Sequence, residues 1–206
     1  MQITIPYAKM LSPAAGYESY DANGSPILIL EREFTVEDGT AMLRRIEYAA
    51  RISHRSEDAI TTDSWRRIIS SVVLQHGDLS VIEHEKVSVE VDVDRGVQTE
   101  WVRHRLMSYT FESTRFVNYV KKMFARFVQP KFTPEQEEHG AVQAWNTAID
   151  AAETAYQFLV RIGVAPQIAR SVFPLALAGK GLVTGNLRSW RHFFIMRTSA
   201  EAHPQM

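Results

Sequence analysis

The stretch WVRHRLMSYTFESTRF, residues 101–116, concentrates side chains that bind anions. It places three arginines and a histidine among aromatic and hydroxyl residues. Guanidinium groups form forked hydrogen bonds to phosphate oxygens, and serine hydroxyls and backbone N–H groups complement them. Ser113 and Arg115 close the stretch, where we expect a loop or strand to present them. This segment is a candidate site for a phosphorylated ligand.

A surface lattice of ion pairs is the alternative interpretation, and such pairs contribute little stability. Leu106, Met107 and Tyr109 interrupt the cations, so the segment cannot lie wholly in solvent. Partly buried guanidinium groups need anionic partners, and few carboxylates lie nearby in the sequence. A bound anion is therefore the favoured interpretation.

A helix from Gly96 to about Met107 is expected to lead into this stretch. On such a helix Arg103 and Arg105 would point about 200° apart, so they would serve different sites. Glu100 would share the face of Arg103. The pattern predicts either one structural arginine or a helix that lies between two sites.

The composition limits the kinds of protein that this chain can be. The 206 residues include 23 Lys and Arg against 24 Asp and Glu, so a basic site must be local. Cysteine is absent, which excludes disulfides, thiolate metal sites and a cysteine nucleophile. No stretch approaches eighteen apolar residues, and no signal peptide is recognisable. We expect a soluble, cytoplasmic protein with no membrane contact.

The expected elements form one α+β domain over residues 1–206, with a mostly antiparallel sheet and packed helices. KVSVEVDVD, residues 86–94, alternates strictly and is the clearest strand. Shorter strands are expected within residues 1–7 and 25–33. Helices are expected at residues 35–51, 61–77, 133–163, 165–177 and 184–199, and the glycine-rich residues 178–186 are expected to form a loop.

The segment QHGDLSVIEHEK allows two interpretations. His76, Glu83 and His84 lie close together, but a pair of histidines eight residues apart is weak support for a metal site, and we predict none. Ser80 followed three residues later by Glu83 is instead typical of a capping box that opens a short helix.

Residues 120–127, VKKMFARF, interleave basic and aromatic side chains, as proteins that bind single-stranded nucleic acid do. A solvated edge beside a core strand has the same pattern, and the near-zero net charge favours it. We therefore expect no nucleic-acid partner.

Five ordered segments make the chain resemble the flavin-dependent thymidylate synthases. Arg103, His104 and Arg105, followed by seven residues and Ser113, match the family signature R-H-R-x7-S. AARIS, HGDLSVIEH, GVAPQIARSVFPL and NLRSWRHFFIMR are similar to four further family segments, between Ala49 and Arg197.

The resemblance implies reductive methylation of a uracil nucleotide at C5. Methylenetetrahydrofolate would give the carbon, and reduced FAD, regenerated by NADPH, would give the hydride. It also implies a homotetramer whose sites are shared between subunits. The absence of cysteine agrees, because this family uses no cysteine nucleophile.

The resemblance also implies roles for single residues. The FAD contacts would be Ser53, Ser80, Glu83, Arg103, His104, Arg105, Asn186, Arg188 and His192. The contacts to a pyrimidine nucleoside monophosphate would be Glu100, Arg103, Glu112, Ser113, Thr114, Arg115, Arg170 and Arg197. Ser113 and Arg197 would be catalytic, with Arg197 favouring negative charge on the pyrimidine during attack.

Departures from the family pattern gather around the expected nucleotide. Thr110 and Phe111 stand where the family has Asn-Glu, Glu112 follows one place later, and Thr114 stands where glycine is common. Glu100 replaces a usual glutamine, and its carboxylate could accept a hydrogen bond from a sugar hydroxyl. We therefore leave dUMP and UMP both open as substrates. A non-catalytic flavin-binding or nucleotide-binding relative is the alternative function, and a single-stranded nucleic-acid-binding protein is the less favoured one.

Overall fold

The computed structural model describes residues 2–11, 17–20, 26–28, 34–121 and 124–206. The chain divides into two compact units, which we describe separately. The first unit comprises Met1–Ala8, Val91–Arg103 and Thr110–Gly181, and the second comprises Lys9–Glu90, His104–Tyr109 and Leu182–Met206. Helices and strands are mixed in the chain, so the predicted α+β class is confirmed.

An antiparallel sheet of four strands has the order β2-β5-β8-β6. Its strands are β2 (Tyr7–Leu11), β5 (Lys86–Asp94), β6 (Ser108–Phe111) and β8 (Ala178–Asn186). β5 is the alternating strand that the sequence predicts. Its second half is buried on both faces, because Asp92 and Asp94 are covered as well as the valines. The carboxylates of this strand therefore need partners inside the protein.

β8 corrects the prediction that residues 178–186 form a loop. The glycines of this segment give the neighbouring side chains room to lie across the strand. A Cβ at Gly181 would overlap the ring of Phe111, and a Cβ at Gly185 would lie 2.9 Å from Cγ of Met107. The glycines thus indicate close packing against a strand, which turn propensities do not reveal.

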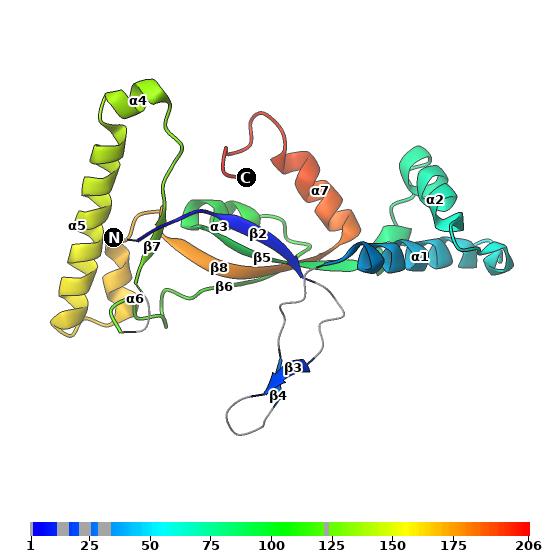
Figure 1. Ribbon diagram of the computed structural model, residues 1–206, viewed down its shortest axis with the longest axis horizontal. Helices are drawn as coiled ribbons and strands as arrows, with labels where there is room; N and C mark the ends of the chain where they lie inside the picture. Colours follow the sequence, from blue (N-terminus) through cyan, green and yellow to red (C-terminus); the bar gives the residue numbers. More distant parts are fainter. Residues whose placement is uncertain (1, 12–16, 21–25, 29–33, 122–123) are drawn as a thin grey trace. The chain divides into compact units, whose positions relative to one another are not determined.

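The first unit packs its helices around β7 (Arg126–Val128), which pairs in parallel with β1 (Gln2–Thr4). The expected long helix is divided into α4 (Pro134–Glu138) and α5 (Ala141–Arg161), because Gly140 adopts φ +85° between them. The expected helix at residues 165–177 is shorter, comprising α6 (Pro166–Ala169) and the 3-10 turn η4 (Arg170–Val172), which lie beside α5 (Figure 1). The core includes Tyr119, Phe127, Ile149, Tyr156 and Leu177. α3 (Arg95–Trp101) belongs to this unit as well.

In the second unit α1 (Val36–Ile52) packs against the short helices that follow it in the sequence. Thr35 caps α1 in a reciprocal capping box with Asp38. The expected helix at 61–77 begins as α2 (Ser64–Ile68) but continues as the π-helix η2 (Ile69–Gln75). Shorter elements of the unit are η1 (Glu57–Ala59), η3 (Val81–His84) and the hairpin β3 (Tyr17–Tyr20) and β4 (Pro26–Leu28).

α7 (Leu187–Arg197) is the last helix of the second unit and confirms the helix predicted near the C-terminus. Asn186 caps it by accepting a hydrogen bond from the backbone N–H of Ser189. Trp190 and Phe193 are buried, and Trp190 donates its ring N–H to the carbonyl of Val87 in β5. β4 confirms part of the strand expected at residues 25–33, whose remaining residues lie outside the described chain.

Candidate functional site

The R-H-R segment lies in a turn, which corrects the helix expected up to Met107. α3 ends at Trp101, and residues 102–107 reverse the chain before β6 begins. Two side chains secure the turn: the Tyr109 hydroxyl donates to the carbonyl of His104, and Ser189 in α7 donates to that of Leu106. Arg103 and Arg105 lie beyond the helix, so the prediction that they point to opposite helix faces is wrong. Both arginines are exposed.

His104 and Arg197 are brought together by this turn. Nε of Arg197 lies 2.9 Å from Nε2 of His104. A guanidinium only donates, so Nε2 accepts and carries no proton. Burial lowers the pKa of His104, and the nearby charges of Arg197 and His192 lower it further. The imidazole is therefore a neutral acceptor that fixes the orientation of Arg197.

Aromatic side chains surround this pair. The His104 ring lies 4.8 Å from that of Phe193 and 6.0 Å from that of His192, measured between centroids. Burial raises the pKa of Tyr109 to about 12, against the opposing charge of Arg197. Tyr109 thus stays a hydroxyl donor at neutral pH.

A second group of predicted residues lies where α7 packs against η3. Arg188 donates to Glu83 at 2.5 Å, with both side chains about half exposed. The capping box predicted for Ser80 and Glu83 is wrong, because the Ser80 hydroxyl donates to Asp78 at 2.7 Å and Glu83 pairs with Arg188. The hydrogen bonds that the hydroxyl and the backbone N–H of Ser80 donate to Asp78 lower the pKa of its carboxyl group.

Ser53 lies at the C-terminal end of α1, with its hydroxyl bonded to the carbonyl of Ala50 and to the His54 ring. Two residues earlier, Arg51 forms an ion pair with the fully buried Glu47 at 2.7 Å and also donates to the carbonyl of Ser56. Sequence reasoning missed Arg51, although it belongs to the same AARIS segment. Arg51 fixes the backbone at the end of α1.

In the first unit, Ser113, Thr114 and Arg115 lie on the loop after β6, one of the two settings expected for Ser113 and Arg115. The Ser113 hydroxyl accepts the backbone N–H of Arg115, and the Ser113 carbonyl accepts those of Phe116 and Val117. Thr114 is buried, whereas Arg115 is exposed. Arg170, which follows α6, donates from Nη1 to the Thr114 hydroxyl at 2.7 Å. The loop therefore brings three of the predicted nucleotide contacts together with Arg170.

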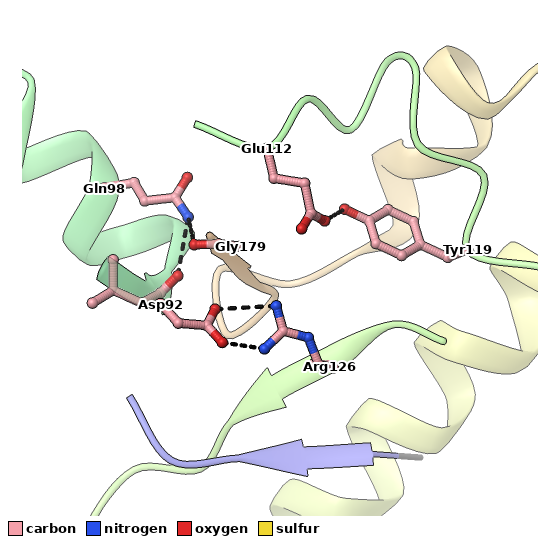
Figure 2. A network of polar contacts seen from close by, with 7 residues as sticks. Asp92, Gln98, Glu112, Tyr119, Arg126 and Gly179 are labelled. Atoms are coloured by element: carbon pink, nitrogen blue, oxygen red, sulfur yellow. Dashed lines mark hydrogen bonds and ion pairs between the residues drawn. The ribbon is translucent and has the colours of Figure 1, made fainter. Parts of the chain in front are cut away.

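Glu112 precedes this loop and is held by a residue that sequence reasoning missed. The hydroxyl of Tyr119 donates to Oε1 of Glu112 at 2.6 Å (Figure 2). Burial and this hydrogen bond raise the pKa of Tyr119 well above its usual value. Tyr119 packs edge-on against Tyr156 and Phe173. A buried phenol thus ties one end of the loop to the other.

Figure 2 also shows a forked ion pair between Asp92 in β5 and Arg126 in β7. Nearby, the amide of Gln98 donates to the carbonyls of Val93 and Gly179 at 3.0 Å. The alternation of β5 places Asp92 on the face opposite its valines, but only the fold supplies Arg126. Because Arg126 is paired and Phe127 is fully buried, neither is presented as a nucleic-acid contact.

The remaining predicted contacts and departures lie close to the turn and the loop in sequence. Glu100 is in the last turn of α3, and its carbonyl accepts the backbone N–H of Arg103. Thr110 is exposed on β6, whereas Phe111 is half-buried and lies over Gly181. Phe111, which departs from the family pattern, thus packs against the glycine-rich strand β8.

Within the described residues, no group of three or more His, Asp or Glu side chains is arranged to hold a metal ion. None of the helices in that part of the chain has the length and hydropathy to cross a membrane.

The protein is an α+β protein with a turn that carries R-H-R, a loop with hydroxyl and arginine side chains, and a last helix with several arginines, which are residue types that suit anionic ligands. The model of the family "Thymidylate synthase complementing protein" matches residues 35–206. The chain is 33% identical to a flavin-dependent thymidylate synthase of Mycolicibacterium vanbaalenii, over 82% of this chain and 71% of that protein. A flavin-dependent thymidylate synthase of Mycobacterium sp. strain KMS is also 33% identical, over 85% of this chain and 78% of its own. One of Geobacter sulfurreducens is 28% identical, over 85% and 75%. The chain therefore belongs to the thymidylate synthase complementing protein family.

Proposed function

We propose that this chain is a flavin-dependent methyltransferase that reductively methylates C5 of a uracil nucleotide. Methylenetetrahydrofolate is the carbon donor in this proposal, and NADPH is the source of reducing equivalents. We also propose a single catalytic domain that assembles into a homotetramer with shared sites. The observation that carries the proposal is the loop of Ser113, Thr114 and Arg115 with Arg170 fixed beside it.

This loop suits a nucleoside monophosphate. Ser113 uses its oxygen to accept the Arg115 backbone N–H, so its O–H group can still donate. The exposed Arg115 and the half-buried Arg170 add charged donors of fork geometry, which match phosphate oxygens. The phosphate would thus be held by a hydroxyl and two guanidinium groups.

Arg197 is proposed to act on the pyrimidine. A cation fixed beside a base favours negative charge that develops on the ring during attack, and preorganisation makes this electrostatic effect larger. His104 supplies the preorganisation, because its neutral Nε2 accepts from Nε of Arg197. The chain contains no cysteine, so no cysteine nucleophile takes part in the proposed reaction.

The residues proposed for FAD fit the chemistry of a dinucleotide. Arg188 is held by Glu83, and Ser80 lies next to η3, against which α7 packs. The proposed contacts combine guanidinium, hydroxyl and imidazole groups, which suit a pyrophosphate and a polar ring edge: Ser53, Ser80, Glu83, Arg103, His104, Arg105, Asn186, Arg188 and His192. Reduced flavin supplies the hydride when bound.

The nucleotide sugar is the open part of the proposal. The relatives named thymidylate synthase favour dUMP, whereas the altered residues Thr110, Phe111 and Glu112 favour a changed sugar environment. The carboxylates of Glu100 and Glu112 could accept a hydrogen bond from a hydroxyl of the sugar. Glu112 has one oxygen committed to Tyr119, which restricts its orientation.

The test is release of tritium from C5 of labelled dUMP and UMP by the purified protein with methylenetetrahydrofolate, FAD and NADPH. Release from at least one nucleotide, dependent on flavin and folate, is the expected result. A strong preference for dUMP would reject a ribonucleotide enzyme. No release from either nucleotide by folded, yellow protein would reject the methyltransferase.

A further inference from the structure

Arg170 is fixed at both ends of its side chain. Its backbone follows α6, whose last residue Ala169 is fully buried. The backbone N–H of Phe173 donates to the carbonyl of Arg170, and the Phe173 ring stacks 4.4 Å from that of Tyr156. The position at which the Arg170 side chain starts is thus set by the aromatic core of the first unit.

Two internal hydrogen bonds orient the guanidinium of Arg170. Nε donates to the carbonyl of Gln167 at 3.2 Å, and Nη1 donates to the Thr114 hydroxyl at 2.7 Å. A guanidinium has five N–H donors, so these two bonds leave three for a ligand. Fixing a rotamer-rich side chain before binding reduces the entropy that the ligand must otherwise offset.

Thr114 is placed to hold Arg170 and is poorly placed to touch a ligand itself. It is only 6% exposed, between the half-buried Ser113 and the exposed Arg115. The loop is closed beneath it by the bond between Tyr119 and Glu112, so Thr114 is anchored independently of any ligand. The loop therefore turns Thr114 inward while it presents its neighbours outward.

We propose that Thr114 is a positioning residue that holds Arg170 in the orientation that binds the phosphate of the nucleotide. A glycine at this position has no hydroxyl, so the threonine provides this arginine with a fixed acceptor. The inference rests on the proposed function, because it takes the phosphate of a uracil nucleotide as the ligand.

The test compares Thr114→Val, which keeps the shape and removes the hydroxyl, with Thr114→Ser, which keeps the hydroxyl. Binding of UMP, dUMP and the phosphate-free nucleosides is measured by calorimetry on the full-length protein with FAD. We expect Thr114→Val to weaken binding of the favoured monophosphate about 10- to 140-fold, the range of a hydrogen bond to a charged group. Thr114→Ser should bind within about twofold of the unaltered protein, on the same scale.

The second part of the test measures nucleotide binding by Arg170→Gln, alone and combined with Thr114→Val. If Thr114 acts through Arg170, Thr114→Val should cause no further loss in the Arg170→Gln background. The KM for the nucleotide should rise more than kcat falls, because ground-state binding is what changes. Thr99→Val is the matched control, since the Thr99 hydroxyl bonds only to the carbonyl of Gly96 within α3.

Melting temperatures establish that each variant is folded, and Thr114→Ala replaces Thr114→Val if the valine variant is not. Unchanged affinity in the folded variant, or an equal loss in the Arg170→Gln background, would overturn the inference while leaving the proposed function intact. Failure of the unaltered protein to bind any uracil nucleotide would overturn the proposed function, and the inference with it.

Discussion

The ring nitrogen Nε2 of His104 accepts a hydrogen bond from Nε of Arg197 at 2.9 Å. This bond connects the R-H-R turn to the end of α7, and it requires a neutral imidazole. Protonation would remove the acceptor and place two positive charges in contact. The state of His104 thus controls both local stability and the orientation of Arg197.

We expect acid to destabilise the protein through His104. Its pKa is lowered in the folded state, so between that value and the usual value of about 6.5 the unfolded chain binds more protons. The free energy of unfolding therefore falls as the pH decreases from about 7, and this loss is complete below the folded pKa. Thermal melts of the unaltered protein and His104→Gln between pH 5 and 8 measure the effect. Glutamine does not titrate, so its profile should be flatter, and equal slopes would contradict the prediction.

Breaking the ion pair of Asp92 with Arg126 should cost far more stability than breaking an exposed ion pair. The Asp92 side chain is 1% exposed and that of Arg126 14%, so Asp92→Asn leaves a buried guanidinium without its counter-ion. Breaking such a pair costs about 3–5 kcal/mol. Asp63→Asn is the control, because the exposed pair of Asp63 with Arg66 should contribute about 0–1 kcal/mol. Urea unfolding measures both, and similar losses in the two variants would refute the ranking.

Tyr119→Phe should destabilise the loop of residues 112–119 more than the rest of the fold. The variant leaves the half-buried carboxylate of Glu112 without its charged hydrogen bond, which costs about 1.5–3 kcal/mol. Tyr156→Phe removes a hydroxyl from the same aromatic cluster. This hydroxyl accepts the backbone N–H of Tyr119 at 3.4 Å, a weaker bond, so its loss should cost less stability. Unfolding free energies and hydrogen exchange of residues 112–119 provide the comparison. Equal exchange in both variants would show that the bond does not hold the loop.

Gly181→Ala should strain the contact between β8 and Phe111. The added methyl group overlaps the ring, and overpacking of this kind costs about 1–3 kcal/mol. Phe111→Ala should offset part of that loss, so the double variant should be more stable than the sum of the single changes predicts. Strict additivity of the unfolding free energies would argue against a direct clash.

The sequence predicts the elements whose signals are local. The helix that begins after Thr35, the alternation of β5 and the end of the long helix at Gly163 all depend on residues a few positions apart. Ser113 and Arg115 were likewise expected on a loop or strand, because they follow the expected helix.

The errors arise from side-chain hydrogen bonds that helix and strand patterns do not predict. The R-H-R segment has helical propensity, but Tyr109 and Ser189 bind its carbonyls and turn the chain toward β6. Ser80 and Glu83 have the spacing of a capping box, but the Ser80 hydroxyl donates its hydrogen bond to Asp78, two residues earlier. Tyr119 and Arg126 gain their roles only from Glu112 and Asp92, which lie elsewhere in the sequence, so no local pattern identifies them.

The Phe111 ring fills the space that a Cβ at position 181 would need, so these two positions cannot vary separately. A larger residue at 181 requires a smaller one at 111, and the same dependence links Gly185 with Met107. Family members should therefore show compensating sizes at each pair. Replacing residues 106–112 with those of a relative should then destabilise the protein unless the matching residues of β8 are replaced as well.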